Sequence, residues 1–459
     1  MKKDMTSGKE WKLILMFTLP IMAGNLLQQM YNTADNIIVG KFVSEAAFSA
    51  VAVTSALAFL FLAFSMGIGT GVGVIISQMF GARREKRLAV AVDTSIILLA
   101  ILGVIMMVVG WIISPFLLRS VLSVPEELLP ISIAYMHVYC IGLPFQFVYN
   151  GISFILRGVG DSKASLYFLA ITASLNIVLD IVAVKLVSGA IAQTAGTAWA
   201  TVISQVVCVA ISYIYMRRRF PFQKGEQHFD RQICGMALRL GLPIAIQQSV
   251  VAFGNVAMQR LVNEFDDKAL IAAFGAGDRL NSFVFVPIIG FQSGLANFAG
   301  QNLGAGRLDR VKRGYRATLI MGLAATILLC VILNLFAPQL VQLFGLEGRS
   351  ITIGTEQLRF YSFCYWFFAM YMILGGVLQG AGDTLLQSIA TLTALIIRVV
   401  LGYVGVAAGW LGYAAAWQTA PIGWCAAVLI TQIRYFTGGW KTKVLVRRDN
   451  AEPKPLEQA

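Results

Sequence analysis

Charged residues are scarce in this chain. Of its 459 residues, 58% are hydrophobic and only 13% are charged, whereas charged residues make up about 25% of an average soluble domain. A soluble protein of this length has too little polar surface to cover so many apolar side chains. The composition therefore excludes a soluble globular protein and indicates a chain that is solvated largely by lipid.

Cysteine and histidine are also rare, with six and two copies, and no CxxC pair occurs. The cysteines lie in or beside apolar segments, so we interpret them as small buried hydrophobic residues rather than as disulfide or zinc ligands. The sequence contains no P-loop and no Ser-His-Asp or metal-hydrolase spacing. We therefore expect neither an enzyme nor an organic cofactor.

The formal net charge of +13 would suit a nucleic-acid partner if it formed a basic stripe with interleaved aromatics. The basic residues lie instead in short loops between apolar runs, so no nucleic-acid partner is expected. They recur in alternate loops, around Arg83, Arg157, Arg217, Arg307 and Lys441. The positive-inside rule assigns these loops and both termini to the cytoplasm. We expect a multi-pass protein of the cell membrane, such as a bacterial inner membrane.

Long apolar runs occupy most of the chain, without the period-two alternation of a β-barrel. A membrane-spanning helix needs about 20 apolar residues, and twelve runs reach that length. The predicted fold is an all-α polytopic membrane protein. Its first span is expected to be uncleaved, because the run is too long for a signal peptide. The expected spans are residues 13–40, 47–79, 88–114, 128–157, 163–187, 190–216, 235–263, 268–300, 315–343, 352–380, 384–406 and 409–435.

The two halves of the chain carry the same landmarks in the same order. SQMFGARR at 77–84 corresponds to GQNLGAGR at 300–307, and LRGVGDSK at 156–163 corresponds to LQGAGDTL at 378–385. The offset is 223 residues for the first pair and 222 for the second. Parallel repeats of this kind are a common transporter plan, with the substrate held between the halves. We predict an N-lobe at residues 1–216, a linker at 217–233, a C-lobe at 234–440 and a cytoplasmic tail at 441–459.

Two carboxylates lie inside predicted spans of the first half. Asp35 lies in the first span and Asp180 in the fifth, where Asn176 precedes it by one helical turn. Ionisable residues are costly in a bilayer and so mark functional sites. Two carboxylates with neutral oxygens suit Na⁺ or a shared proton, and Thr197 or Thr201 could add a hydroxyl. Alternatively, Asp35 is an acid near the outer end of its helix, and Asn176 with Asp180 only stabilises helix packing.

The second half lacks these acids. The repeat offset places Met258, Gly402 and Arg398 at the positions of Asp35, Asp180 and Asn176. A structural role required by the shared fold would recur in both halves. A pair of acids kept in only one half therefore indicates an ion site there.

The segments LPIMAGNLLQQMYNTADNIIVGKF, SQMFGARREKRL and LRGVGDSK resemble the multidrug and toxic compound extrusion (MATE) transporters, and the likeness covers nearly the whole chain. The resemblance implies two six-helix bundles related by a pseudo-twofold axis, in a V around a central cavity. It also implies export of cationic or amphipathic organic compounds in exchange for H⁺ or Na⁺.

The same resemblance implies roles for individual residues. Asp35, Asn176, Asp180 and Thr201 match the cation or proton site of the family's N-lobe, and Pro20 matches a proline linked to bending of the first helix. If the ion is Na⁺, Asp35, Asn176 and Asp180 are its expected ligands.

One departure concerns the seventh span. The branch of the family typified by the NorM proteins has a glutamate there, whereas this chain has Gln247 and Gln248 but no acid at 241–260. The sequence is closer to the DinF-like branch, and the N-lobe is left as the expected coupling site.

Further polar and aromatic residues are candidates for the substrate cavity. Aromatic rings can stack on planar organic cations, and amide or charged side chains can orient them. Structural pairing is the alternative for Asp278, and simple packing is the alternative for the aromatic residues. The candidates are Tyr31, Tyr139, Asn150, Phe154, Asp278 and Arg398.

Other functions remain open at this stage. A lipid-linked precursor flippase of the same superfamily would place basic residues in the cavity, and Arg398 is the one deep candidate. A channel is less consistent with two related lobes, and a receptor or scaffold would need a soluble sensor domain. The expected partners are small organic cations or amphipathic drugs and the lipid bilayer, with the chain acting as a monomer.

Overall fold

The computed structural model describes residues 4–220 and 228–446, and within these ranges the regular structure is entirely helical. The first half contains α1 (Glu10–Phe42), α2 (Glu45–Gly81), α3 (Glu85–Phe116), η1 (Leu117–Val121), α4 (Leu129–Gly158), α5 (Ser162–Leu186) and α6 (Ala190–Arg219). The second half contains α7 (Arg231–Asn263), α8 (Lys268–Gly304), α9 (Leu308–Gln342), α10 (Arg349–Ser362), α11 (Tyr365–Ala381), α12 (Thr384–Ala407), α13 (Ala415–Gln418), α14 (Ala420–Thr437) and η2 (Gly439–Lys443).

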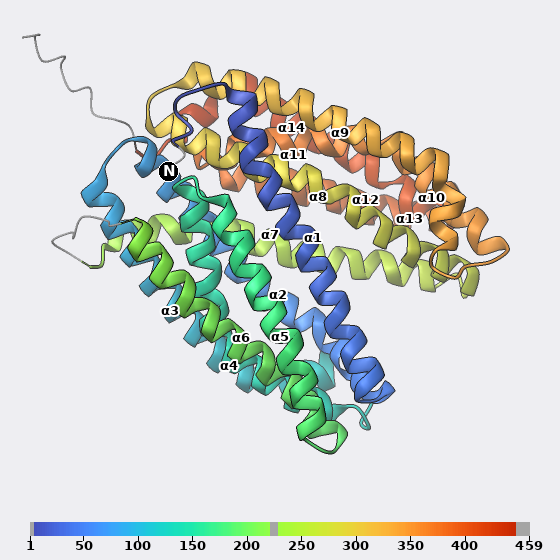
Figure 1. The fold of residues 1–459 in the computed structure, drawn as a ribbon. Helices are drawn as coiled ribbons and strands as arrows, with labels where there is room; N and C mark the ends of the chain where they lie inside the picture. The colour runs from blue at the N-terminus through green and yellow to red at the C-terminus, as the bar shows by residue number, and fades with distance from the viewer. Residues whose placement is uncertain (1–3, 221–227, 447–459) are drawn as a thin grey trace, which may run out of the picture.

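The helices form two bundles, α1–α6 and α7–α14, which meet at one end and diverge toward the other (Figure 1). The N-terminus lies where the bundles meet (Figure 1). We call this the closed end; the α2–α3, α4–α5, α8–α9 and α11–α12 connections lie there. The expected arrangement of two bundles in a V is confirmed.

Glycines let the two bundles approach closely at the closed end. A side chain at Gly81, at the end of α2, would collide with the backbone carbonyl of Gln301 on α8. A side chain at Gly304 would collide in the same way with the carbonyl of Gln78. The contacts are related by the 223-residue offset of the repeat, so the crossing of α2 and α8 obeys the pseudo-twofold symmetry.

The two glutamines at this crossing connect the bundles by a matched pair of hydrogen bonds. Gln78 Nε2 donates to the carbonyl of Gly380 at 2.9 Å, and Gln301 Nε2 donates to the carbonyl of Gly158 at 2.9 Å. Each glutamine also accepts from a terminal segment: Gln301 from the amide of Met5 at 3.0 Å, and Gln78 from the amide of Leu445 at 2.8 Å. Both ends of the described chain are thereby fixed at the closed end.

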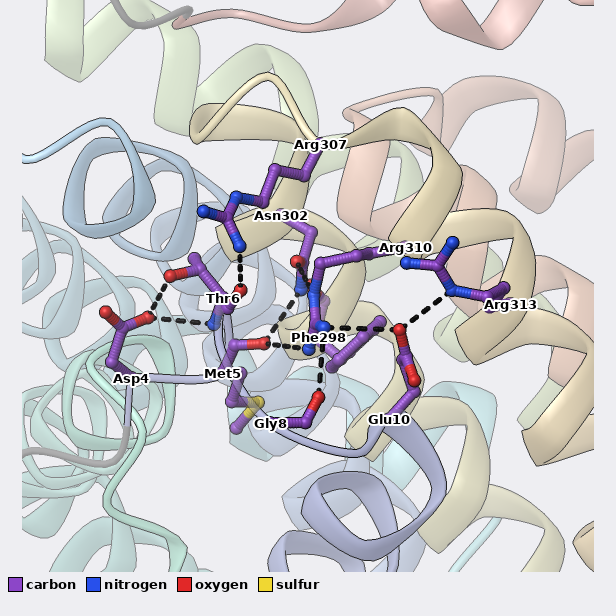
Figure 2. Close-up of polar contacts among 10 residues, drawn as sticks. All are labelled: Asp4, Met5, Thr6, Gly8, Glu10, Phe298, Asn302, Arg307, Arg310 and Arg313. Atoms are coloured by element: carbon purple, nitrogen blue, oxygen red, sulfur yellow. Dashed lines mark hydrogen bonds and ion pairs between the residues drawn. The ribbon is translucent and has the colours of Figure 1, made fainter.

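Residues 4–9, which precede α1 and which we call the N-terminal strap, lie along α8 and α9 of the other bundle (Figure 2). Arg310 of α9 is the main anchor. It donates to the carbonyl of Gly8 at 2.9 Å, to that of Met5 at 3.3 Å and to Glu10 Oε1 at 3.2 Å. Arg307 donates to the carbonyl of Thr6 at 2.7 Å. These bonds satisfy strap carbonyls that no helix satisfies.

Ten of the described helical segments are long and apolar enough to cross a membrane, or eleven if the bent pair α10–α11 counts as one span. The helix axis bends by 49° between α10 and α11. The expected twelfth span at 409–435 is divided between α13 and α14, and α14 carries Arg434 in its last turn. The count of twelve stays a prediction.

The helices around the expected linker are longer than hydropathy suggests. α6 continues through Arg217, Arg218 and Arg219, because cations are stabilised near a helix C-terminus. Similarly, α7 begins at Arg231, after Asp230 has capped its first turn. Residues 221–227 of the predicted linker and 447–459 of the predicted tail lie outside the described residues.

Candidate functional site

The two carboxylates of the first half meet between α1 and α5. Asp35 and Asp180 lie within hydrogen-bonding reach of each other, and Asp180 is fully buried. Two carboxylates in direct contact cannot both stay charged without a proton or cation between them, because like charges repel strongly at this range. The pair can therefore hold a single proton or a cation.

Asn176 and Thr201 complete this cluster. In the amide orientation that satisfies both of its polar atoms, Asn176 Nδ2 donates to Asp180 Oδ2 at 2.9 Å, and Oδ1 accepts from Thr201 Oγ1 at 3.1 Å. The alternative threonine, Thr197, donates to the carbonyl of Thr194 at 2.9 Å instead. The structure thus brings together Asp35, Asn176, Asp180 and Thr201; their role in ion binding stays a prediction.

The donor set fits a hard monovalent cation or a proton. Asp35, Asp180 and Thr201 offer oxygen atoms, which Na⁺ prefers to nitrogen or sulfur, whereas Asn176 in this orientation turns its amide nitrogen toward Asp180. Asp180 Oδ1 is buried and has no hydrogen-bond partner among the described residues, so an acceptor is available at the pair. No group of three His, Cys, Asp or Glu residues suited to a metal occurs in the described part of the chain.

The cluster adjoins a cavity of about 360 Å³ inside the first bundle. Five helices line it: α1, α2, α4, α5 and α6. Asp35 and Thr201 form part of its wall, together with three of the expected substrate-facing residues, Tyr31, Tyr139 and Asn150. Pro20, inside α1, also lines it. An ion bound at the carboxylate pair would therefore adjoin a compartment large enough for a small organic molecule.

Three other expected cavity residues lie elsewhere. Phe154 packs against Gly69 and Gly73 of α2 and is absent from the cavity wall. Asp278 and Arg398 belong to the second bundle, where Asp278 accepts from Asn281 at 3.5 Å and Arg398 donates to Asn255 at 3.3 Å.

In the second bundle an apolar contact occupies the equivalent of the carboxylate pair. A Cβ atom at Gly402 would lie 3.1 Å from Met258 Cε, and Met258 is fully buried. The methionine side chain thus fills the space beside the glycine. The two bundles share a scaffold, and only the first has acids at these positions.

Of a polar stripe on α4, only Asn150 was predicted from the sequence. Gln146, Asn150, Ser153 and Arg157 all line the cavity. Their spacing of three or four residues is that of one helix face, so the signal was present in the sequence. Arg157 was not predicted to line the cavity, because it lies beside a loop and matches the basic residues that the positive-inside rule uses to set orientation.

Comparison with known proteins agrees with the repeat. A family model described as MatE matches the chain twice, over residues 20–182 and 243–404. The two matches are offset by 223 residues at their starts and 222 at their ends.

Curated relatives cover most of the chain. The chain is 29% identical to the "Probable multidrug resistance protein YpnP" of Bacillus subtilis, over 83% of this chain and 85% of the relative. It is 24% identical to the "Probable multidrug resistance protein NorM" of Thermotoga maritima, over 84% and 83%. It is also 25% identical to a "FAD transporter" of Shewanella oneidensis, over 76% and 77%. The comparisons do not separate the DinF-like branch from the NorM-like branch.

Solved structures share the fold. Crystal structures titled as MATE in the straight conformation and in the bent conformation superpose with TM-scores of 0.87 and 0.88. Each is 23% identical and covers 96% of this chain and 98% of its own. With the double match over more than half of its length, the chain belongs to the MatE family of membrane transporters.

Proposed function

We propose that this chain is a secondary antiporter that exports cationic or amphipathic organic compounds in exchange for H⁺ or Na⁺. Family membership supports multidrug efflux. The observation that carries the coupling is the closeness of Asp35, which lines the cavity, to the buried Asp180. No organic cofactor is needed, because the ion gradient is the energy source.

Coupling follows from the different ion affinities of two conformations. A ligand shifts a conformational equilibrium only as far as it binds one state better than the other. An ion or proton that neutralises the carboxylate pair favours a different packing of α1 against α5. Pro20 interrupts the hydrogen-bond ladder of α1, so this helix can bend there as the pair changes charge.

The proposal also covers location and organisation. We place the closed end and both termini in the cytoplasm, because the basic loops gather at that end. The described structure is then open to the outside. The functional units are an N-lobe at 1–216 and a C-lobe at 234–440, and a monomer contains the whole site.

Transport in proteoliposomes tests the proposal. The full chain is reconstituted with rhodamine 6G, a fluorescent organic cation, and a pH gradient and a Na⁺ gradient are imposed separately. We expect one gradient to drive dye movement, and Asp180→Asn to abolish it while the variant still inserts and binds dye. Gradient-driven transport at the wild-type rate in Asp180→Asn would contradict the proposed coupling site.

A further inference from the structure

Arg157, in the last turn of α4, is a half-buried cation that forms no salt bridge with another described residue. It lines the cavity of the first bundle, and its guanidinium carbon lies 4.6 Å from the centroid of the Phe154 ring. Its Nε atom is buried and has no hydrogen-bond partner among the described residues. The nearby Asp161 is engaged elsewhere: it accepts from the amide of Ala164 at 3.2 Å and from Tyr215 Oη at 2.8 Å.

A positive charge without an ionic partner is unfavourable at this position unless a bound ligand supplies the partner. An unpaired charge inside a membrane protein is costly, and the Nε atom of Arg157 is buried without a hydrogen-bond partner among the described residues, so packing alone accounts poorly for this arginine. The guanidinium presents a planar set of donors that matches a carboxylate or phosphate in a bidentate geometry.

Three serines of α4 and α5 line the same cavity. Ser153 precedes Arg157 by one turn of α4, and Ser162 and Ser165 lie in the first turn of α5. Hydroxyl groups can donate to an oxyanion. Ser165 Oγ donates to the carbonyl of Ser153 at 3.4 Å in this structure and would have to turn toward a bound anion, whereas Ser153 Oγ is buried without a hydrogen-bond partner among the described residues. The donors at this part of the cavity are therefore complementary to an anionic group.

The acidic pair and Arg157 lie toward different ends of the cavity. Tyr139 is on the same helix as Arg157 and precedes it by 18 residues, which corresponds to roughly 27 Å at the helical rise. Tyr135, one turn before Tyr139, lies near Asp35, and both residues line the cavity. An anion bound at Arg157 would thus lie far from Asp35 and leave the carboxylate pair free for the coupling ion.

We infer that Arg157, with Ser153, Ser162 and Ser165, forms a subsite for the carboxylate or phosphate group of a transported organic compound. This inference rests on the proposed function, because it assigns a substrate class to the same cavity. It widens that class from organic cations to amphipathic compounds that carry an acidic group. The repeat places Gln379 at the position of Arg157, so the second bundle lacks the charge.

Two pairs of fluorescent probes isolate the acidic group. Rhodamine 19 is the free carboxylic acid of the ester rhodamine 6G, and flavin mononucleotide is the phosphate ester of riboflavin. Binding to the purified full-length chain is measured by fluorescence anisotropy, which needs no ion gradient. We expect the acid of at least one pair to bind more tightly than its neutral or esterified counterpart. The pair that responds distinguishes carboxylate from phosphate recognition.

Arg157→Gln introduces the residue found at the equivalent position of the second half. We expect it to weaken binding of the acid about tenfold or more, as for a charge-assisted hydrogen bond, and to leave the counterpart unchanged. Arg279→Gln, which removes an exposed arginine from α8, is the matched control and should change neither.

Equal affinities of wild-type protein for both members of each pair would overturn the inference. So would an equal loss for both members in Arg157→Gln. If that variant does not fold, the double variant Ser162→Ala/Ser165→Ala is measured instead; selective weakening of the acid supports the subsite, and unchanged selectivity overturns it. Selective binding without gradient-driven transport would contradict the antiport proposal alone, and transport without selectivity would contradict the subsite alone.

Discussion

At the scale of single residues, the central feature is the proposed sharing of a proton or ion by Asp35 and Asp180. The helical spacing of Asn176 and Asp180 predicts that they share a face, and of the two expected threonines the structure places Thr201 beside Asn176. Arg157 could have been predicted from its spacing with Asn150 and Ser153. The orientation of Phe154 could not have been predicted from the sequence. Phe154 is adjacent to Ser153 in the sequence, so its side chain points about 100° away from the stripe, and tertiary packing decides which of these faces meets the cavity.

Thr201→Val tests whether the hydroxyl that bonds Asn176 supports the pair. Valine keeps the shape of threonine but cannot donate to the amide oxygen, so the Asn176 side chain loses one partner. We expect ion affinity to fall several-fold, with little change in thermal stability. The concentration of ion that gives half-maximal transport measures this. Thr197→Val is the control, because the Thr197 hydroxyl donates to a carbonyl of its own helix, α6; equal effects of the two variants would contradict the assignment.

At the scale of elements, the N-terminal strap connects the bundles through backbone carbonyls. Such a contact cannot be predicted from a periodic pattern in the sequence, because most of the acceptors are backbone groups and the donor Arg310 is 300 residues away from Glu10. The sequence therefore predicts only that this terminus is cytoplasmic and does not predict the strap. The strap also pairs Asp4 with Arg83 of the α2–α3 connection at 3.6 Å.

The charge of Asp4 in the strap, and the contacts that depend on it, should not change with pH in the physiological range. Burial raises the pKa of Asp4, but hydrogen bonds from Thr6 and the charge of Arg83 outweigh it, so the pKa lies below its ordinary value of 3.8. A carboxylate with a lowered pKa contributes stability above its unfolded pKa and loses it only as pH falls through the folded value. Asp4→Asn should therefore leave the pH profile of transport between pH 6 and pH 8 unchanged. A shifted profile would contradict this.

Arg310→Ala should weaken the closed end. The side chain bonds three strap or α1 acceptors as well as Asn302 at 3.0 Å, and bonds to charged groups contribute about 1.5–3 kcal/mol each. We expect a several-fold larger population in which the bundles separate there. Distances between spin labels at Lys86 and Lys312, exposed residues of α3 and α9, measure it in a variant without native cysteines.

Arg313→Ala is the matched control for that measurement. Arg313 bonds Glu10 at 2.9 Å and is largely exposed, so its loss should have a much smaller effect. Identical distance distributions for Arg310→Ala and wild type would show that the strap does not hold the closed end.

At the scale of the whole molecule, the repeat explains most of what sequence could predict. Matched motifs at offsets of 223 and 222 residues predict two bundles of the same plan, and both the double family match and the symmetric contacts of Gln78 and Gln301 bear this out. The span count could not be fixed, because α10–α11 bends and α13–α14 is interrupted. Hydropathy averages over a window and does not detect such breaks.

Symmetry also makes a prediction about the crossing of α2 and α8. Gly81→Ala and Gly304→Ala each place a methyl group against a backbone carbonyl of the other bundle. We expect both variants to open the closed end to a similar extent, as measured with the same spin labels. Gly275→Ala is the control, because no atom lies within 4 Å of its added Cβ. If the closed end stays as closed in Gly81→Ala and Gly304→Ala as in Gly275→Ala, the role assigned to these two glycines is wrong.

Linkage between substrate and ion tests the central claim most directly. If Asp35 and Asp180 hold the coupling ion, then the ion and the substrate must change each other's affinity by the same factor. The measurement is the affinity of the purified chain for rhodamine 6G across a series of pH values and Na⁺ concentrations. The account predicts that wild-type affinity depends on one of these ions and that Asp180→Asn removes the dependence while still binding dye. An Asp180→Asn variant that retains the full dependence would contradict it.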